Sequence, residues 1–217
     1  KWAFEGKLTN KNVVEGELPK GWNLMKLGEI SEMCLGKMLD KAKNKGKLHP
    51  YLRNINVRWG TFDLSDLIEM RFEEFERERY SLKKGDLVIC EGGEPGRCAI
   101  WTYNELMYIQ KALHRVRMHN GYDARYISNY IFFSALNGCL EEYFTGTTIK
   151  HLTGKELKKV IIPIPSTLEE QNTIVAEIES RLSVCDKIEE TIEQGLKQAE
   201  ALRQSILKKP SRAGSCP

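Results

Sequence analysis

Side chains that could contact nucleic acid are concentrated in a few short segments of this 217-residue chain. Arg and Lys match the hydrogen-bonding edge of guanine, Asn and Gln match that of adenine, and Lys and Thr suit phosphate oxygens. The candidates are Lys41, Lys43, Lys45, Lys47, Tyr51, Arg53, Asn54, Arg97, Gln110, Lys111, His114, Thr147, Thr148 and Lys150. Surface loops often have a similar composition, so residue types alone support DNA binding only weakly.

The charge is unevenly distributed along the chain. The net charge is only +3, but residues 37–58 contain seven Lys and Arg residues against Asp40, a local charge of +6. Residues 63–79 contain seven carboxylates and three arginines, a local charge of −4. The basic stretch could therefore meet phosphate, and the alternative is a solvated loop.

Enzymatic motifs are not convincing. The segment Cys90–Arg97 is rich in glycine, but no Gly-Lys-Ser/Thr follows it, so we interpret it as a tight turn. Glu156 and Lys158 form a Glu-x-Lys element of the kind that some nucleases use, without a convincing upstream Asp. The four histidines form no zinc-binding pair, and a methyltransferase cofactor loop is missing. We predict that the chain is not an enzyme and holds no metal or cofactor.

The elements that position these residues are predicted to form an α+β domain over residues 18–168. Short apolar runs at 87–90, 98–101 and 160–162 indicate strands between glycine turns. Residues 123–136 have helical spacing, and Asp123 is a plausible cap. Residues 1–17 are polar and are predicted to be a linker or the end of a preceding element.

A long helix is predicted over residues 169–209, followed by a tail at 210–217. Ser166 or Thr167 could cap it, and apolar residues recur every three or four positions from Ile174 to Ile206. Such a helix would be about 58 Å long, more than the domain could cover. We therefore expect a coiled-coil arm. Its predicted partner-contacting residues are Ile178, Leu182, Cys185, Ile188, Ile192 and Leu202.

The six cysteines have no regular spacing, which favours reduced thiols in the cytoplasm over a disulfide framework. No apolar run approaches the ~18 residues of a membrane span, so we expect no membrane partner.

Four stretches together resemble one known family, the specificity (S) subunits of type I DNA restriction-modification systems. They are Leu18–Trp22 with Lys26–Ile30, Gly85–Arg97 with Gln110–Val116, Gly146–Leu152, and Pro163–Pro165 with Glu169–Gln171. They cover nearly the whole chain in the family's order. Ala3–Leu8 also resembles the end of a preceding family helix, so we expect one half of a two-domain subunit, the C-terminal half.

The resemblance implies a division of labour. The globular domain is expected to read one half of a bipartite double-stranded DNA target. The long helix is expected to pair antiparallel with the other half of the subunit, or with a second copy, and to dock methylation (M) subunits. S-adenosylmethionine is then expected on the M subunits and ATP on the restriction (R) subunits, which join indirectly. We assign Lys41–Lys47, Thr147, Thr148 and Lys150 to phosphate and the remaining candidates to groove or backbone contacts.

Two alternatives remain open from the sequence. One is a coiled-coil assembly adaptor whose globular part binds protein, which the basic stretch argues against. The other is a nuclease that uses Glu156 and Lys158.

Overall fold

The computed structural model describes residues 1–10, 12–14, 16–40 and 42–208. Lys41, Lys209 and the tail 210–217, to which predictions were attached, lie outside the described residues. The chain divides into two units, Lys1–Val175 and Ala176–Pro217. The mixed α+β fold and the long C-terminal helix are both as predicted.

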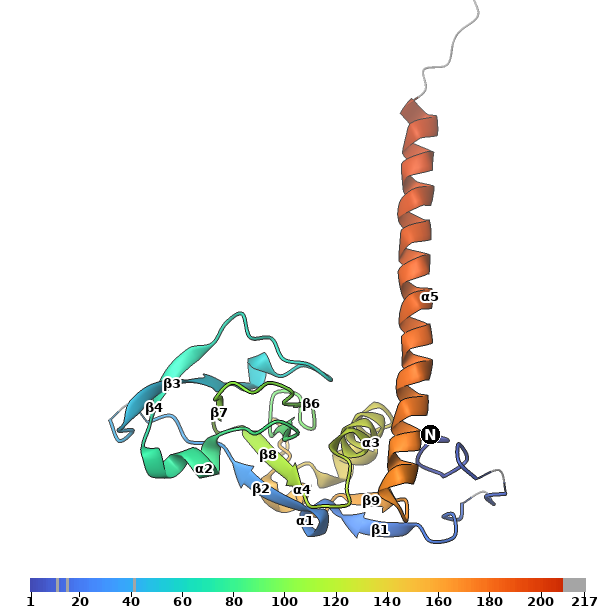
Figure 1. Ribbon diagram of the computed structural model, residues 1–217. Coiled ribbons are helices and arrows are strands. Elements are labelled where there is room, and N and C mark those ends of the chain that lie inside the picture. Colours follow the sequence, from blue (N-terminus) through green and yellow to red (C-terminus); the bar gives the residue numbers. More distant parts are fainter. Residues whose placement is uncertain (11, 15, 41, 209–217) are drawn as a thin grey trace, which may run out of the picture. The chain divides into compact units, whose positions relative to one another are not determined.

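Three small sheets form the framework of the first unit (Figure 1). The strands are β1 (Asn23–Lys26), β2 (Ser31–Leu35), β3 (Lys47–Leu52), β4 (Ile68–Phe72), β5 (Leu87–Cys90), β6 (Cys98–Ile100), β7 (Tyr108–Ile109), β8 (Leu113–Met118) and β9 (Ile161–Ile164). The α-helices are α1 (Leu27–Ile30), α2 (Arg77–Tyr80), α3 (Ala124–Leu136), α4 (Gly154–Leu157) and α5 (Leu168–Lys208). The 3-10 helices are η1 (Asn54–Asn56), η2 (Glu74–Glu76) and η3 (Cys139–Tyr143).

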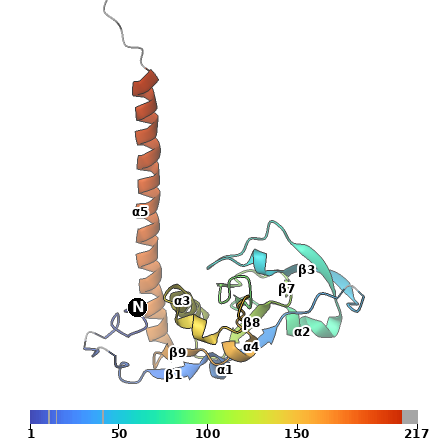
Figure 2. The same ribbon diagram turned by 180° about the vertical axis from the view of Figure 1, so that it is seen from behind.

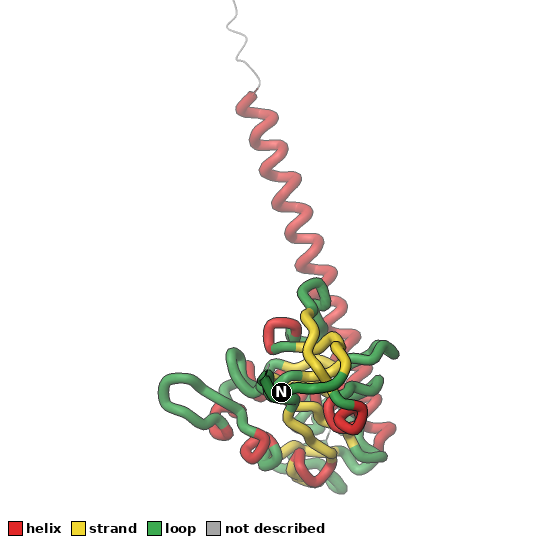
Figure 3. Tube along the Cα trace, turned by 90° about the vertical axis from the view of Figure 1, so that its left-hand side faces the viewer, coloured by secondary structure: helices red, strands yellow, loops and turns green. Residues whose placement is uncertain are grey.

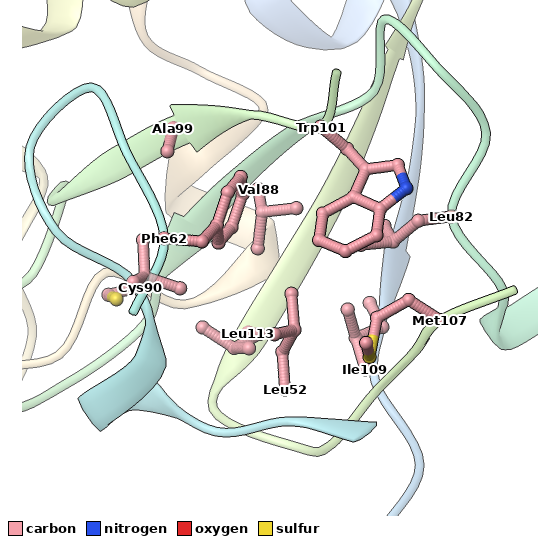
Figure 4. Packing of buried hydrophobic residues seen from close by; sticks show 11 residues of the cluster. Leu52, Phe62, Leu82, Val88, Cys90, Ala99, Trp101, Met107, Ile109 and Leu113 are labelled. Carbon is pink, nitrogen blue, oxygen red and sulfur yellow. The ribbon is translucent and has the colours of Figure 1, made fainter. Parts of the chain in front are cut away.

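The central sheet has the strand order β2-β8-β5-β6, and every pairing in it is antiparallel. All four residues of β5 are buried, as expected for an apolar run in the middle of a sheet. The side chains of Val88 and Cys90 pack in one cluster with Leu52, Phe62 and Trp101, as Figure 4 shows. The predicted strand at 87–90 is therefore confirmed, and the one predicted at 98–101 is present but ends one residue earlier, at Ile100. The third predicted strand, at 160–162, begins one residue later and extends to Ile164.

The second sheet places β3 between β4, which is antiparallel to it, and β7, which is parallel to it. Its buried face is aromatic, because Phe72 stacks on Tyr108 with ring centroids 4.0 Å apart and Tyr51 lies in the same cluster. The pairing of β3 with β4 brings the basic stretch beside the acidic stretch.

Helix α3 packs against the N-terminal segment of the chain. The Asp123 side chain accepts a hydrogen bond from the Arg125 backbone N–H, so the predicted cap is confirmed. Phe4 is buried with its ring 5.2–5.5 Å from those of Tyr126, Tyr130 and Phe133. We expected the domain to begin at residue 18; instead, this ring contact joins the N-terminal segment to the first unit.

Strands β1 and β9 form a separate antiparallel pair, which lies near α3 in Figures 1 and 2. The Tyr126 hydroxyl donates to the Pro163 carbonyl at 2.7 Å and ties α3 to this pair.

Helix α5 is continuous over its 41 residues, as Figure 3 shows. Of the two predicted caps, Thr167 accepts from the Glu170 N–H at 3.2 Å, whereas the Ser166 hydroxyl donates to the Gly21 carbonyl. Ile174 and Val175 are fully buried in the first unit. No helix among the described residues is long and apolar enough to cross a membrane.

Candidate DNA-contacting surface

The glycine turn Glu91–Arg97, between β5 and β6, is the structural centre of the candidate surface. Gly93 and Gly96 have φ values of +75° and +92°, which glycine adopts without steric cost. A Cβ on Gly96 would also lie 2.3 Å from Leu140. The prediction of a tight turn is therefore confirmed.

Two other predicted segments are joined to this turn by backbone hydrogen bonds. The Glu91 N–H donates to the Ala112 carbonyl at 2.8 Å, and the Leu152 N–H donates to the Glu91 carbonyl at 2.7 Å. The His151 ring lies over Gly92, because a Cβ there would be 2.9 Å from His151 Nδ1. Residues 110–114 and 145–152 are thus brought together although they are distant in sequence.

A third segment reaches the turn through side chains. Asn54 Nδ2 donates to the Gly92 carbonyl at 2.8 Å, and Arg97 donates from Nη2 to the Asn54 carbonyl at 2.9 Å. Trp59 Nε1 donates to the Glu94 carboxylate at 2.6 Å, and Glu94 also accepts from Arg97 Nη1 at 2.8 Å. Through these four side chains, the loop 53–59 after β3 is hydrogen-bonded to the glycine turn.

Four of the seven cations in the basic stretch are paired with carboxylates. Lys37 is buried and paired with Glu76, Arg53 pairs with Asp66 at 2.7 Å, and the weaker pairs are Arg58 with Asp63 and Lys43 with Asp40. Three of these partners belong to the acidic stretch 63–79. The local charge of +6 therefore overstates the positive surface that is available to phosphate.

Two predicted DNA contacts are inconsistent with the structure. Tyr51 is 1% exposed in the aromatic core, and burial raises the pKa of its hydroxyl. His114 is also 1% exposed, its Nε2 lies 3.1 Å from the Leu152 carbonyl oxygen, and burial lowers its pKa. Tyr51 lies in β3 and His114 lies in β8, and the register of these strands turns both side chains toward the core. Residue types alone do not reveal this register.

Neighbouring arginines on β8 are structural as well. Arg115 is buried and donates from Nη1 to the carbonyls of Glu78, Arg79 and Ser81, while Nη2 donates to Glu32. Arg117 forms two 2.7 Å hydrogen bonds with Asp86, which helps to raise the pKa of that arginine.

Seven further candidates are exposed or half-buried at the surface. Lys45 and Lys47 are exposed near the start of β3, and Lys111 is exposed beside the glycine turn, with Gln110 half-buried next to it. Thr147, Thr148 and Lys150 are exposed in the turn that the paired backbones of Thr145 and His151 close. We call Ile55, Lys111, Thr147, Thr148 and Lys150 the turn-centred surface.

Sequence reasoning missed three residues of this region. Asn56 is buried and holds the loop through its bonds to the Arg53 N–H and to the Asp63 and Asp66 carbonyls. Trp59 packs on Phe132 at 4.9 Å, and Ile55 is an exposed apolar side chain. For Trp59, the sequence offered one signal, an aromatic residue directly before Gly60 in an otherwise polar stretch.

Within the part of the chain that the structure describes, no group of three or more His, Cys, Asp or Glu side chains could hold a metal ion. Glu156, which the nuclease alternative requires, lies in α4 and pairs with Lys159 at 2.8 Å.

A second candidate surface lies on α5. Among its predicted partner-contacting residues, Ile178 is half-buried, and Leu182, Cys185, Ile188, Ile192 and Leu202 are exposed. Leu196 and Ile206 continue the same apolar stripe and are exposed as well.

Comparison with known proteins identifies the class. Residues 19–198 match the family described as the type I restriction modification DNA specificity domain, and the chain belongs to this family.

The particular relatives are specificity subunits. The chain is 30% identical over 182 residues to the EcoKI type I restriction enzyme specificity subunit of Escherichia coli strain K12, a match covering 79% of this chain and 38% of that protein. It is 26% identical over 203 residues to the Escherichia coli EcoBI specificity subunit, covering 90% of this chain and 42% of that protein. The chain thus spans less than half the length of these relatives.

Two solved structures share the fold. One comes from a study of complex assembly and conformational transition of the type I R-M system, with a TM-score of 0.71 and 19% identity over 96% of this chain and 50% of that chain. The other is the HsdS subunit from Thermoanaerobacter tengcongensis, with a TM-score of 0.66 and 19% identity over 92% of this chain and 47% of that chain.

Proposed function

We propose that this chain reads one half of a bipartite double-stranded DNA target and docks methylation subunits through α5. The observation that carries the proposal is the convergence of segments 53–59, 110–114 and 145–152 on the glycine turn. Each segment contributes exposed groups there, including lysines that suit phosphate and threonines that can hydrogen-bond to DNA. Membership of the specificity-domain family supports the same function.

The α5 stripe is the proposed assembly surface. An apolar row with a repeat of three to four residues is typical of a helix that packs on another helix. Leu182, Ile188 and Ile192 are 48–57% exposed, so burying what remains of each side chain against a partner would contribute about half of the 1.5–3 kcal/mol expected for a fully exposed one, roughly 1 kcal/mol. We propose that the partner helix is the antiparallel helix of the other half of the subunit or of a second copy.

Catalysis is assigned to the partners. In this proposal the chain contributes no catalytic residue, the methylation subunits bind S-adenosylmethionine, and the restriction subunits bind ATP and join indirectly. This chain supplies the sequence preference of the assembly.

The test is to co-purify the chain with its cognate methylation subunit and to measure methyl transfer from S-adenosylmethionine to random-sequence DNA. We expect a stable complex that methylates adenine within a defined split sequence. Methylation with no sequence preference, or the same preference without the chain, would contradict the proposal.

A charge reversal separates this function from an assembly adaptor. Lys43→Glu, Lys45→Glu and Lys47→Glu together should weaken DNA binding of the complex, because phosphate contacts are salt-dependent and charge-driven. Of these, Lys45 and Lys47 form no ion pair with any described residue. Unchanged DNA binding together with intact assembly would favour the adaptor.

A further inference from the structure

We propose that Arg97 and Asn54 are positioning residues that determine DNA sequence specificity without touching DNA. This inference rests on the proposed function, because it concerns how the turn-centred surface is held. Both residues were predicted as DNA contacts from their types. The structure instead directs the Asn54 Nδ2 group to the Gly92 carbonyl and the Arg97 Nη groups to the Asn54 carbonyl and the Glu94 carboxylate.

The contacts form a reciprocal junction. The Asn54 side chain donates to the turn at Gly92, and Arg97, at the end of the turn, donates back to the Asn54 backbone. The guanidinium also bridges to Glu94, which in turn accepts from Trp59. A planar guanidinium can span two acceptors in this way, whereas an ammonium group cannot reproduce the fork.

Access to the junction is restricted. The Arg97 side chain is only 16% exposed, and its Nε atom and the Asn54 Oδ1 atom are buried. DNA could reach these atoms only if the loop separated from the turn. The donors that remain, Arg97 Nη1 and Nη2 and Asn54 Nδ2, already donate to protein acceptors in the closed junction.

The junction fixes two reading segments relative to each other. On one side, Arg53 and Asn56 hold the loop rigid through Asp66, and the loop presents Ile55. On the other side, Glu91 binds the backbones of residues 112 and 152, next to Lys111 and the 145–151 turn. Directional hydrogen bonds at the junction fix the position of Ile55 relative to Lys111 and the 145–151 turn. Small displacements of such side chains alter which base edges they can match.

The test uses the complex with the methylation subunit and DNA carrying either its preferred sequence or single-base changes. Arg97→Lys keeps the charge but loses the fork. We expect its preference for the target to fall by about tenfold, with the slope of log affinity against log salt unchanged. Asn54→Ala removes the opposite half of the junction and should behave alike. The double variant should lose little more than the worse single variant, because the two hydrogen bonds hold the same loop on the same turn.

Lys45→Gln is the matched control, because Lys45 is exposed, lies outside the turn-centred surface and was assigned to phosphate. Loss of this phosphate contact should reduce the salt slope by about 0.9 and leave the preference unchanged. Should Arg97→Lys unfold in thermal melts, Asn54→Ala decides the question alone. An unchanged preference in the folded variants, or a salt slope lower by about 0.9 in Arg97→Gln, which removes the charge, overturns the positioning role. A wild-type complex without any preference overturns the proposed function itself.

Discussion

The two units of this chain treat their apolar side chains in opposite ways. In residues 1–175 the apolar residues of β5 and the core-facing Tyr126, Ile127 and Ile131 of α3 are buried, and even cations such as Lys37 and Arg115 are paired inside. In residues 176–208 leucines and isoleucines are largely exposed, although they follow a regular stripe. The second unit is therefore a regular helix whose apolar side chains are still largely exposed to solvent.

The difference indicates where each unit obtains its stability. A helix whose apolar face has no partner gains little from packing, and most helical stability in proteins comes from such packing. The first unit can fold on its own core, whereas the stripe on α5 gains its stabilisation only when another helix covers it. Substitutions should therefore act on folding in one unit and on association in the other.

The largest expected effect tests this separation directly. Leu182→Asp combined with Ile188→Asp should abolish pairing with the partner helix, because two carboxylates would be desolvated in an apolar seam. The fold of residues 1–175 should be spared, since both positions lie outside that unit. Sedimentation velocity measures the association, and near-UV circular dichroism reports the packing of the first unit.

Glu189→Asp is the control, since it stays on α5 without adding a carboxylate. Unchanged sedimentation of the double variant in the presence of the partner would show that the stripe is not the interface.

A matched pair on the same helix sharpens the comparison. Ile174 is fully buried and Ile188 is 54% exposed, yet both belong to one apolar stripe. Ile174→Ala should lower the free energy of unfolding of the first unit by about 2–5 kcal/mol through cavity formation. Ile188→Ala should change that free energy by less than about 0.5 kcal/mol and weaken association instead. Chemical denaturation of both variants checks the difference, and equal losses would contradict the two-unit description.

The sequence was sufficient where local patterns determine structure. The strand at 87–90, the helix with its Asp123 cap and the long helix after Thr167 all depend on residues a few positions apart. The same holds for the glycine turn, in which positive φ values at Gly93 and Gly96 follow from composition.

The candidate site was less predictable, because its outcome depends on long-range pairing. Part of the basic stretch is neutralised only once β3 lies beside β4, and this pairing is what brings Arg53 within reach of Asp66. Tyr51 and His114 have residue types that suit DNA contacts, yet strand register directs them into the core. Arg97 and Asn54 bind each other across 43 residues.

A smaller effect is expected on the salt dependence of DNA binding, which should differ between exposed and ion-paired cations of the first unit. Lys111 is exposed, while Arg53 donates to both the carbonyl and the carboxylate of Asp66. Lys111→Gln should lower the slope of log affinity against log salt by about 0.9. The factor by which DNA affinity falls between 50 and 200 mM salt should then be roughly threefold smaller than in the wild-type complex. Arg53→Gln should leave the slope unchanged and lower thermal stability. Fluorescence anisotropy titrations at several salt concentrations distinguish the two.

If Arg53→Gln also reduces the slope by about 0.9, Arg53 contacts phosphate in the complex and its ion pair with Asp66 must open on binding.

The smallest expected effect concerns pH and is confined to the first unit, because residues 176–208 contain no histidine. Burial lowers the pKa of His114 below its usual value near 6.5, so below that pH the unfolded chain binds more protons than the folded one. His114 should therefore reduce stability progressively as the pH falls through about 6.5, and have no such effect above pH 7.5. His114→Gln should give a shallower dependence of the melting temperature on pH between 7 and 5 than the wild-type chain does. A wild-type slope in His114→Gln would mean that other groups carry the acid sensitivity of the core.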